Sequence, residues 1–365
     1  MLLWGAAGII VAILAAIYFL FLRPPTVPVH VADREEILAA RPTQLLVFRF
    51  RPAQDIVVLD FPTLHQQGEM LNRVAALIEK AGVPRDRVLN DAELAAAIRA
   101  SGDTPDTYYY GHDYRAADLV RFFRLMARDH IAPNPEERRL RALLGQFHWF
   151  QPGAVGAIIT LPGPGVAPGL DPAGRATILE HELSHGAYFT VPAYDVYAQH
   201  FFYDVLDHSE RELFRRFLSS QGYDTAIADL VVNETQAYLM FTADPRFFSA
   251  SLLGMAPRRL QALRALYWPG IPVAWLKQSV PDPAHTSSQP TPASTRPRRR
   301  RKRFQRLACV SRRRVFASNV APAVRAASSA RPRAARYASA VGSSCDRSPC
   351  NSRSDEAIAR TMSRP

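Results

Sequence analysis

Two histidines four residues apart, His181 and His185, lie within a segment whose pattern predicts one helix. The pair Asp171–Pro172 is typical of a helix start, with an acidic cap and a proline in the first turn. The apolar side of this helix carries Ile178, Leu179 and Leu183. Residues four apart differ by about 40° around a helix axis, so both imidazoles point to one side. Two nitrogen ligands on one rigid face can hold a single zinc ion.

The glutamate between them, Glu182, completes the pattern HExxH. It lies about 100° around the helix from His181, close enough to reach a water molecule on a bound metal. A carboxylate there can take a proton from the water and later deliver it to a leaving amine. The alternative is a pair of surface histidines beside an ion-paired glutamate. Chance would produce HExxH about 0.01 times in a chain of this composition, which favours the metal site.

A third protein ligand is needed, because catalytic zinc has three protein ligands and one open position. The segment VVNETQAYLM (Val231–Met240) offers Glu234 on a second predicted helix. A carboxylate among such apolar neighbours needs a partner, and one zinc ion per chain would supply it. The alternative partner is an arginine such as Arg211 or Arg215. Other candidate ligands in the intervening segment are His200, Asp207 and His208.

These residues carry a resemblance to a known class. The sequence HELSHGAYFT, followed about fifty residues later by NETQAY, resembles the gluzincin class of zinc metallopeptidases and is similar to membrane-anchored peptidases of bacteria. The resemblance covers roughly residues 150–245 and is a match to the class alone. It implies that His181, His185 and Glu234 bind zinc and that Glu182 is the general base.

One position departs from the class. Some gluzincins carry an aspartate four residues after the ligand glutamate, where it supports a zinc-binding histidine, whereas this chain has Tyr238. Its hydroxyl can give the same support, and an ordinary core tyrosine is the alternative. Zincins also bind the substrate backbone along an edge strand before the motif helix, and Ala154–Leu161 is either that strand or a core strand. Candidates for the oxyanion stabiliser are Tyr188, Tyr194, Tyr197, His200, Tyr203, His208 and Tyr223.

The remaining pattern predicts an α+β fold, in which a small N-terminal sheet is followed by a mainly helical, zincin-like core. Gln44–Arg51 and Asp55–Phe61 are predicted as the strands of a hairpin. Helices are expected over residues 31–42, 64–81, 90–100, 116–130 and 135–147. From about 172 to 268 the pattern is helical, with breaks near 191, 222 and 244. Thr107–Tyr114 is expected to be a loop that packs on the core or lines a cleft.

Residues 2–22 contain no charge, and this run is long enough to cross a bilayer of about 30 Å. It is longer than a signal-peptide core and no small-residue cleavage site follows, so we predict a transmembrane anchor over residues 1–22, with a cleaved signal as the alternative. Proline-rich residues 23–30 are predicted as a linker. Arg23 alone would favour a cytoplasmic domain. The lack of cysteine in the body instead favours a single-pass protein of the bacterial inner membrane with an extracytoplasmic domain.

Charge and cysteine divide the chain at about residue 280. Residues 290–365 carry 19 basic and 3 acidic side chains, whereas the rest of the chain carries 26 basic and 30 acidic ones. The acidic body argues against specific nucleic-acid binding. The three cysteines all lie in the basic part, so the body has no disulfide and no Cys-type zinc site. Few large apolar residues occur over 281–365, which predicts a disordered basic tail.

We therefore predict a metallopeptidase domain over residues 31–280 that hydrolyses peptide bonds with zinc and with Glu182 as general base. Its partners would be a peptide or protein substrate and the membrane. The alternative is a catalytically silent, membrane-anchored binding or scaffold protein that keeps zinc for structure. Glu182 separates the two hypotheses, because a scaffold has no need of a carboxylate beside an open metal position.

Overall fold

The computed structural model describes residues 27–167 and 169–283, and these residues form an α+β protein with mostly helical secondary structure. Within them, five strands make one mixed sheet in the order β1-β2-β3-β5-β4. The strands are β1 (Val29–Ala32), β2 (Leu46–Phe50), β3 (Ile56–Phe61), β4 (Asp113–Arg115) and β5 (Ala157–Pro162). The predicted anchor and all but the first residues of the predicted tail lie outside the described residues. None of the described helices is long and apolar enough to cross a membrane.

The pairing of the strands confirms the predicted hairpin, corrects the extent of the predicted linker and selects one of the two interpretations of Ala154–Leu161. β2 and β3 are antiparallel neighbours, with Val47 opposite Leu59. β1 runs parallel to β2 from Val29 onward, so the predicted linker of residues 23–30 extends too far into the domain. β5 lies between β3 and β4 and is buried along its length. It is therefore a core strand, and the sheet edge beside the motif helix is β4.

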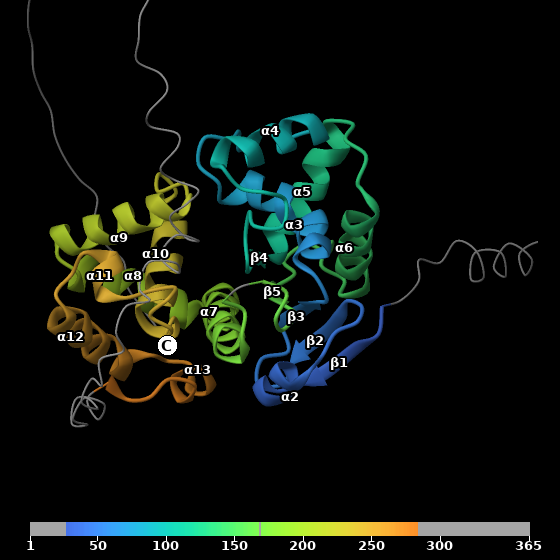
Figure 1. Ribbon diagram of the computed structural model, residues 1–365. Helices are drawn as coiled ribbons and strands as arrows, with labels where there is room; N and C mark the ends of the chain where they lie inside the picture. The colour runs from blue at the N-terminus through green and yellow to red at the C-terminus, as the bar shows by residue number, and fades with distance from the viewer. Residues whose placement is uncertain (1–26, 168, 284–365) are drawn as a thin grey trace, which may run out of the picture. The chain divides into compact units, whose positions relative to one another are not determined.

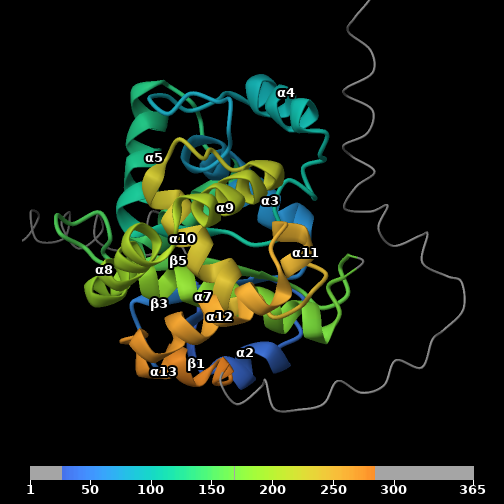
Figure 2. The same ribbon diagram turned by 90° about the vertical axis from the view of Figure 1, so that its left-hand side faces the viewer.

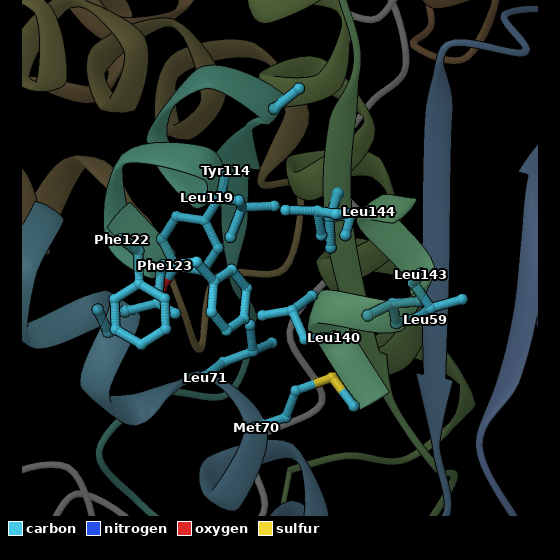
Figure 3. Close-up of a cluster of buried hydrophobic side chains, with 14 of the residues drawn as sticks. Leu59, Met70, Leu71, Tyr114, Leu119, Phe122, Phe123, Leu140, Leu143 and Leu144 are labelled. Atoms are coloured by element: carbon cyan, nitrogen blue, oxygen red, sulfur yellow. The ribbon is translucent and has the colours of Figure 1, made fainter. Parts of the chain in front are cut away.

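Three helices cover one face of the sheet: α3 (Leu64–Ile78), α5 (Ala116–Arg128) and α6 (Pro135–Gln146). Strand side chains alternate between faces, so Leu59 and Tyr114 point toward these helices. Figure 3 shows them meeting Met70, Leu71, Leu119, Phe122, Phe123, Leu140, Leu143 and Leu144. Each fully buried side chain of this kind contributes about 1.5–3 kcal/mol, which makes this cluster a main source of stability. The helix α4 (Asp91–Ser101), which is capped by Asn90, packs on α3.

The helix with the HExxH pattern, α7 (Pro172–Thr190), packs on the opposite face together with α2 (Arg34–Ala39). Asp171 caps α7 as predicted, because its carboxylate accepts the Gly174 N–H at 2.8 Å. Gly186 lets the helix approach the sheet closely, since a Cβ at that position would lie 2.9 Å from the side chain of Ile56. The middle of α7 is thereby held against the strands.

Beyond α7 the described chain is almost wholly helical. Its elements are α8 (Pro192–His200), η2 (Phe201–Val205), α9 (His208–Gln221), α10 (Ala228–Gln236), η3 (Ala237–Phe241), α11 (Ala250–Leu253), α12 (Pro257–Tyr267), η4 (Trp268–Gly270) and α13 (Ala274–Gln278). In Figure 1, α7 has strands β3 and β5 on one side and these later helices on the other. The helix α10 lies beside α7 in Figures 1 and 2. Because α7 is packed from both directions, most of its polar side chains are buried: Arg175, Glu180, Glu182, Ser184 and His185.

The predicted breaks near residues 191, 222 and 244 all fall between helical elements. Three features differ from the prediction. The short strands β1 and β4 were not predicted, and neither was the break at Leu206 that separates η2 from α9. The sheet is also not confined to the N-terminal part, because α3 to α6 are interleaved with β3, β4 and β5 along the chain.

Candidate metal centre

The three predicted metal ligands converge in the interior of the protein. His181 and His185 come from the middle of α7, and Glu234 comes from α10. The two Nε2 atoms are 3.0 Å apart, and each lies 3.7 Å from one carboxylate oxygen of Glu234. His185 and Glu234 have no exposed surface. The packing of α10 on α7 thus joins two segments that are far apart in the sequence.

The arrangement fits a zinc ion. Two atoms that each lie about 2.0–2.1 Å from a tetrahedral zinc are roughly 3.4 Å apart, and the observed separations bracket that value. Both oxygens of Glu234 are buried and neither has a hydrogen-bond partner. A buried charge without a partner carries a desolvation penalty on the order of several kcal/mol, and a bound cation would offset this penalty.

A hydroxyl group sets the protonation of His181. Its Nδ1 lies 2.8 Å from Oγ1 of Thr242, and that hydroxyl donates its proton to the carbonyl of Ala237 at 3.1 Å. Thr242 can therefore only accept from the Nδ1–H of His181, which leaves Nε2 as a free lone pair. The sequence analysis missed Thr242, because no periodicity or motif distinguishes it.

Tyr238 does not supply this hydrogen bond. Its ring packs edge-on against the His181 ring, with 4.8 Å between the centroids, and it also contacts Phe217 and Phe248. Tyr238 therefore supports His181 by ring packing, while the hydrogen bond comes from Thr242.

A second acidic group lies on the other side of His185. The Nδ1 of His185 is buried without a hydrogen-bond partner, and Oδ2 of Asp113 on β4 lies 3.7 Å from it. Asp113, Glu182 and His185 offer polar atoms within 4.8 Å of one another. The sequence analysis did not single out Asp113, which lies near the end of the segment expected to be a loop.

The motif glutamate lies beside the ligands and is almost fully buried. Glu182 is 5% exposed, and its Oε2 has no hydrogen-bond partner. Its carboxylate packs against Gly111, in the loop that leads into β4, and a Cβ at position 111 would overlap with Oε1. Glycine is required there because any side chain would displace the carboxylate.

Four buried carboxyl groups surround the centre: Glu79, Asp113, Glu182 and Glu234. Burial raises the pKa of each, and repulsion from neighbouring carboxylates raises three of them further, with the pKa of Glu79 reaching about 8. Burial lowers the pKa of His181 to about 3 and that of His185 to about 4. The imidazoles are therefore neutral at pH 7, as metal ligands must be, and a divalent cation would offset the repulsion between the carboxylates.

The arginines considered as partners of Glu234 bind elsewhere. Arg211 donates to the carbonyls of Tyr203 and Leu206 at 2.9 and 2.6 Å, and Arg215 donates to the carbonyl of Thr225 at 2.9 Å. The other candidate ligands are also engaged or remote. His200 is an exposed partner of Asp204, Asp207 caps α9, and His208 is exposed at the start of that helix.

Most candidates for the oxyanion stabiliser are occupied by other contacts. Tyr188, Tyr194 and Tyr197 donate to Asp229, Gln236 and the Tyr267 carbonyl, respectively, and Tyr203 is exposed. Tyr223 differs from them, because it lies near Glu234 and partly offsets the rise in pKa that burial gives that carboxyl. The structure therefore leaves Tyr223 as the tyrosine of this group that faces the centre.

No protein-family model matches the chain, and searches of curated proteins and of solved structures likewise found no match.

Proposed function

We propose that the chain is a zinc-dependent metallopeptidase with a zincin-like domain and one zinc ion held by His181, His185 and Glu234. The observation that supports this most is the convergence of three ligand side chains, two of them fully buried, beside a glutamate that is not a ligand. That glutamate, Glu182, has a carboxylate oxygen without a partner. A site built only to bind a metal would have no use for it.

Zinc, when bound, supplies Lewis acidity toward a peptide carbonyl and a water molecule. Glu182 takes a proton from the attacking water and passes it to the leaving amine nitrogen, so that the C–N bond breaks with a neutral amine as product. Burial raises the pKa of Glu182, and a raised pKa is expected of a carboxylate that acts as a base near neutral pH. Thr242 keeps Nε2 of His181 free of a proton.

One observation favours a second function. The loop with Gly111 packs against Glu182, whose side chain is almost fully buried, so little of this carboxylate is open to a peptide. A closed centre is also what a structural zinc site requires. The second candidate is therefore a binding or scaffold protein in which zinc is held for stability.

The proposal includes the membrane. The uncharged run of residues 2–22 and the prolines after it support a single-pass anchor in a bacterial inner membrane, with the peptidase domain on the extracytoplasmic side. A substrate would then be a peptide or protein outside the cytoplasm.

The test is to compare the full chain with its Glu182→Gln variant for zinc content and for turnover of a mixed peptide library. The variant should keep one zinc per chain, because Glu182 is not a ligand, and should lose turnover by about 10²–10⁴-fold. The matched control is Glu180→Gln on the same helix, since Glu180 is buried and pairs with Arg34 away from the ligands. That control should keep both zinc and turnover.

Equal turnover in wild type and Glu182→Gln would refute the mechanism. Zinc in both proteins with turnover in neither would favour the scaffold. Full zinc content in a His181→Ala, His185→Ala double variant would show that the metal binds elsewhere.

A further inference from the structure

We propose that Asp113 is a positioning residue for His185: its carboxylate accepts the Nδ1–H of that histidine and so directs Nε2 toward the metal. This inference rests on the proposed zinc centre. Some gluzincins place such a carboxylate on the ligand helix, at the position that is Tyr238 in this chain. Here the sheet edge, β4, brings the carboxylate to the histidine instead.

The geometry leaves His185 with this acid on the side away from Glu234. Nδ1 of His185 lies 3.7 Å from Oδ2 of Asp113, and Nε2 lies 3.7 Å from Oε1 of Glu234. His185 is fully buried and Asp113 is 8% exposed, so water does not easily replace either contact. The buried Nδ1 has no hydrogen-bond partner. With a metal on Nε2, the proton of this imidazole lies on Nδ1, where the side chains of Asp113 and Asn233 are the polar neighbours. Of the two, the carboxylate is the stronger acceptor.

A chain of hydrogen bonds holds Asp113 in place. The side-chain amide of Asn233 donates to Oδ2 of Asp113 at 3.3 Å, and Asn233 accepts in turn from the amide of Gln236 at 3.3 Å. Gln236 accepts from the hydroxyl of Tyr194 at 2.6 Å. All of these side chains are buried. Asn233 and Gln236 flank the ligand Glu234 in sequence, so the NETQ segment supplies a ligand and also supports the carboxylate behind another ligand.

The two histidines differ in the partner behind them. His181 donates to the neutral hydroxyl of Thr242, whereas His185 faces a carboxylate. A carboxylate behind an imidazole makes the opposite nitrogen a stronger metal ligand and fixes the orientation of the ring. The 3.7 Å separation is longer than a hydrogen bond of about 2.7–3.2 Å. A cation on Nε2 makes Nδ1–H a better donor, so we expect the contact to tighten when metal binds.

The same atoms offer one competing arrangement, in which Asp113, Glu182 and Nδ1 of His185 hold the metal. The structure favours the Nε2 side, because Thr242 leaves Nε2 of His181 unprotonated and that atom lies 3.0 Å from Nε2 of His185. Without a metal, the two Nε2 atoms can share one proton in a hydrogen bond, and a bound cation would take the place of that proton. Among the described residues, the group on the Nδ1 side has only one imidazole, that of His185.

The experiment uses the full chain and three variants: Asp113→Asn, Asp113→Glu and the control Asp229→Asn. Asp229, on α10, pairs at 3.0 Å with Arg115, which lies on β4 like Asp113. Asp229 is not one of the candidate metal ligands. Zinc affinity is measured by competition with a chelator. Asp113→Asn should bind one zinc at saturation with about 10–100-fold weaker affinity. Asp113→Glu should recover most of the affinity, and Asp229→Asn should match wild type.

A second readout excludes a merely structural effect. With cobalt(II) in place of zinc, the visible absorption of Asp113→Asn should shift, because the donor strength of His185 changes. The spectrum of Asp229→Asn should not shift. Thermal unfolding of the metal-free proteins shows whether each variant is folded, and the Asp113→Glu variant serves the same comparison if Asp113→Asn is unstable.

The outcomes separate this inference from the proposed function. Wild-type affinity and spectrum in a folded Asp113→Asn would overturn the inference alone. A folded Asp113→Asn that binds no zinc at saturation would make Asp113 a ligand and overturn it as well. A wild-type chain that binds no zinc would overturn the proposed function together with the inference.

Discussion

One helix, α7, carries two buried charged clusters of opposite character. Near its N-terminus, Arg175 reaches both oxygens of Asp60 at 3.0 and 2.8 Å and the carbonyl of Ile37 at 3.1 Å, and it also donates to the carbonyl of Pro162. Nearly three turns later, the Nδ1 of His185 and the carboxylate of Glu234, which comes from α10, have no hydrogen-bond partners. Arg175, Asp60, His185 and Glu234 are all almost fully buried.

The two clusters differ in whether their buried polar atoms have partners within the chain. This difference distinguishes a structural ion pair from a candidate binding site. The pair of Arg175 and Asp60 satisfies nearly all of its polar atoms and joins α7 to β3, so it needs nothing from outside the chain. The cluster around His185 and Glu234 has ligand atoms in excess of donors, and its carboxyl groups repel one another. Such a deficit of positive charge in the core favours the binding of a cation.

The largest effect is expected from breaking the satisfied pair. Asp60→Asn leaves the Arg175 guanidinium buried without its counter-ion, and the free energy of unfolding should fall by about 3–5 kcal/mol. Urea unfolding of the metal-free chain measures this. The control is the double replacement Asp60→Leu with Arg175→Met, which removes both charges and should lose less than Asp60→Asn alone. A loss below about 1 kcal/mol in Asp60→Asn would show that the pair is not structural.

A smaller and opposite pattern is expected for the unsatisfied cluster. Glu234→Gln removes a buried charge without a partner, so the metal-free chain should be no less stable than wild type. Zinc at 100 times its Kd should stabilise wild type by about 2.7 kcal/mol and should not stabilise the variant. Unfolding with and without chelator measures both quantities.

Glu137→Gln is the matched control for that prediction. Glu137 is equally buried but pairs with Arg73 at 2.8 Å, so its replacement should lower the stability of the metal-free chain and leave the gain from zinc intact. Equal losses in Glu137→Gln and Glu234→Gln would remove the distinction between paired and unpaired carboxylates.

The smallest effect is expected at the exposed start of α7. Asp171 receives two hydrogen bonds from Arg246 at 2.8 and 2.9 Å, which together with the Gly174 N–H lower its pKa to about 2. Because the folded pKa lies below the ordinary value of 3.8, this stabilisation is present above about pH 4 and is lost as pH falls toward 2. Asp171→Asn keeps the cap but not the ion pair, so at pH 7 the melting temperature should fall by less than about 2 °C.

The pH dependence is the control for this last change. The melting temperatures of wild type and Asp171→Asn should converge as pH falls from about 4 to about 2, because protonated Asp171 no longer pairs with Arg246. A difference that stays constant over this range would assign the effect to the cap rather than to the ion pair.

The sequence analysis succeeded where a feature depends on neighbouring residues. The start of α7 at Asp171–Pro172 follows from capping, and the placement of two histidines on one side follows from helical spacing. It missed β1 and β4, which have four and three residues. Strands this short show no alternation to detect, and pairing with β2 and β5 is what makes them strands. Of the two interpretations left open for Ala154–Leu161, the core strand is the one observed, because β4 occupies the sheet edge.

The supporting residues of the centre show the same division. Thr242 and Asp113 reach the two histidines from η3's C-terminal end and from the sheet edge. Neither residue type is unusual in its local sequence, so no pattern could select them. The predicted support from Tyr238 followed from a resemblance between sequences, and the structure assigns the hydrogen bond to Thr242 instead.

By itself, the sequence determined that His181, Glu182 and His185 share one helix, that Glu234 lies on another, and that both helices are mostly apolar around these groups. Those properties follow from spacing, capping and composition over a few residues, where the geometry of a helix is fixed. Only the tertiary structure brings the two helices together, with the candidate ligand atoms 3.0 to 3.7 Å apart, and packs Gly111 on Glu182. It also decided which acid stands behind His185, because such contacts depend on how distant segments pack around a shared core.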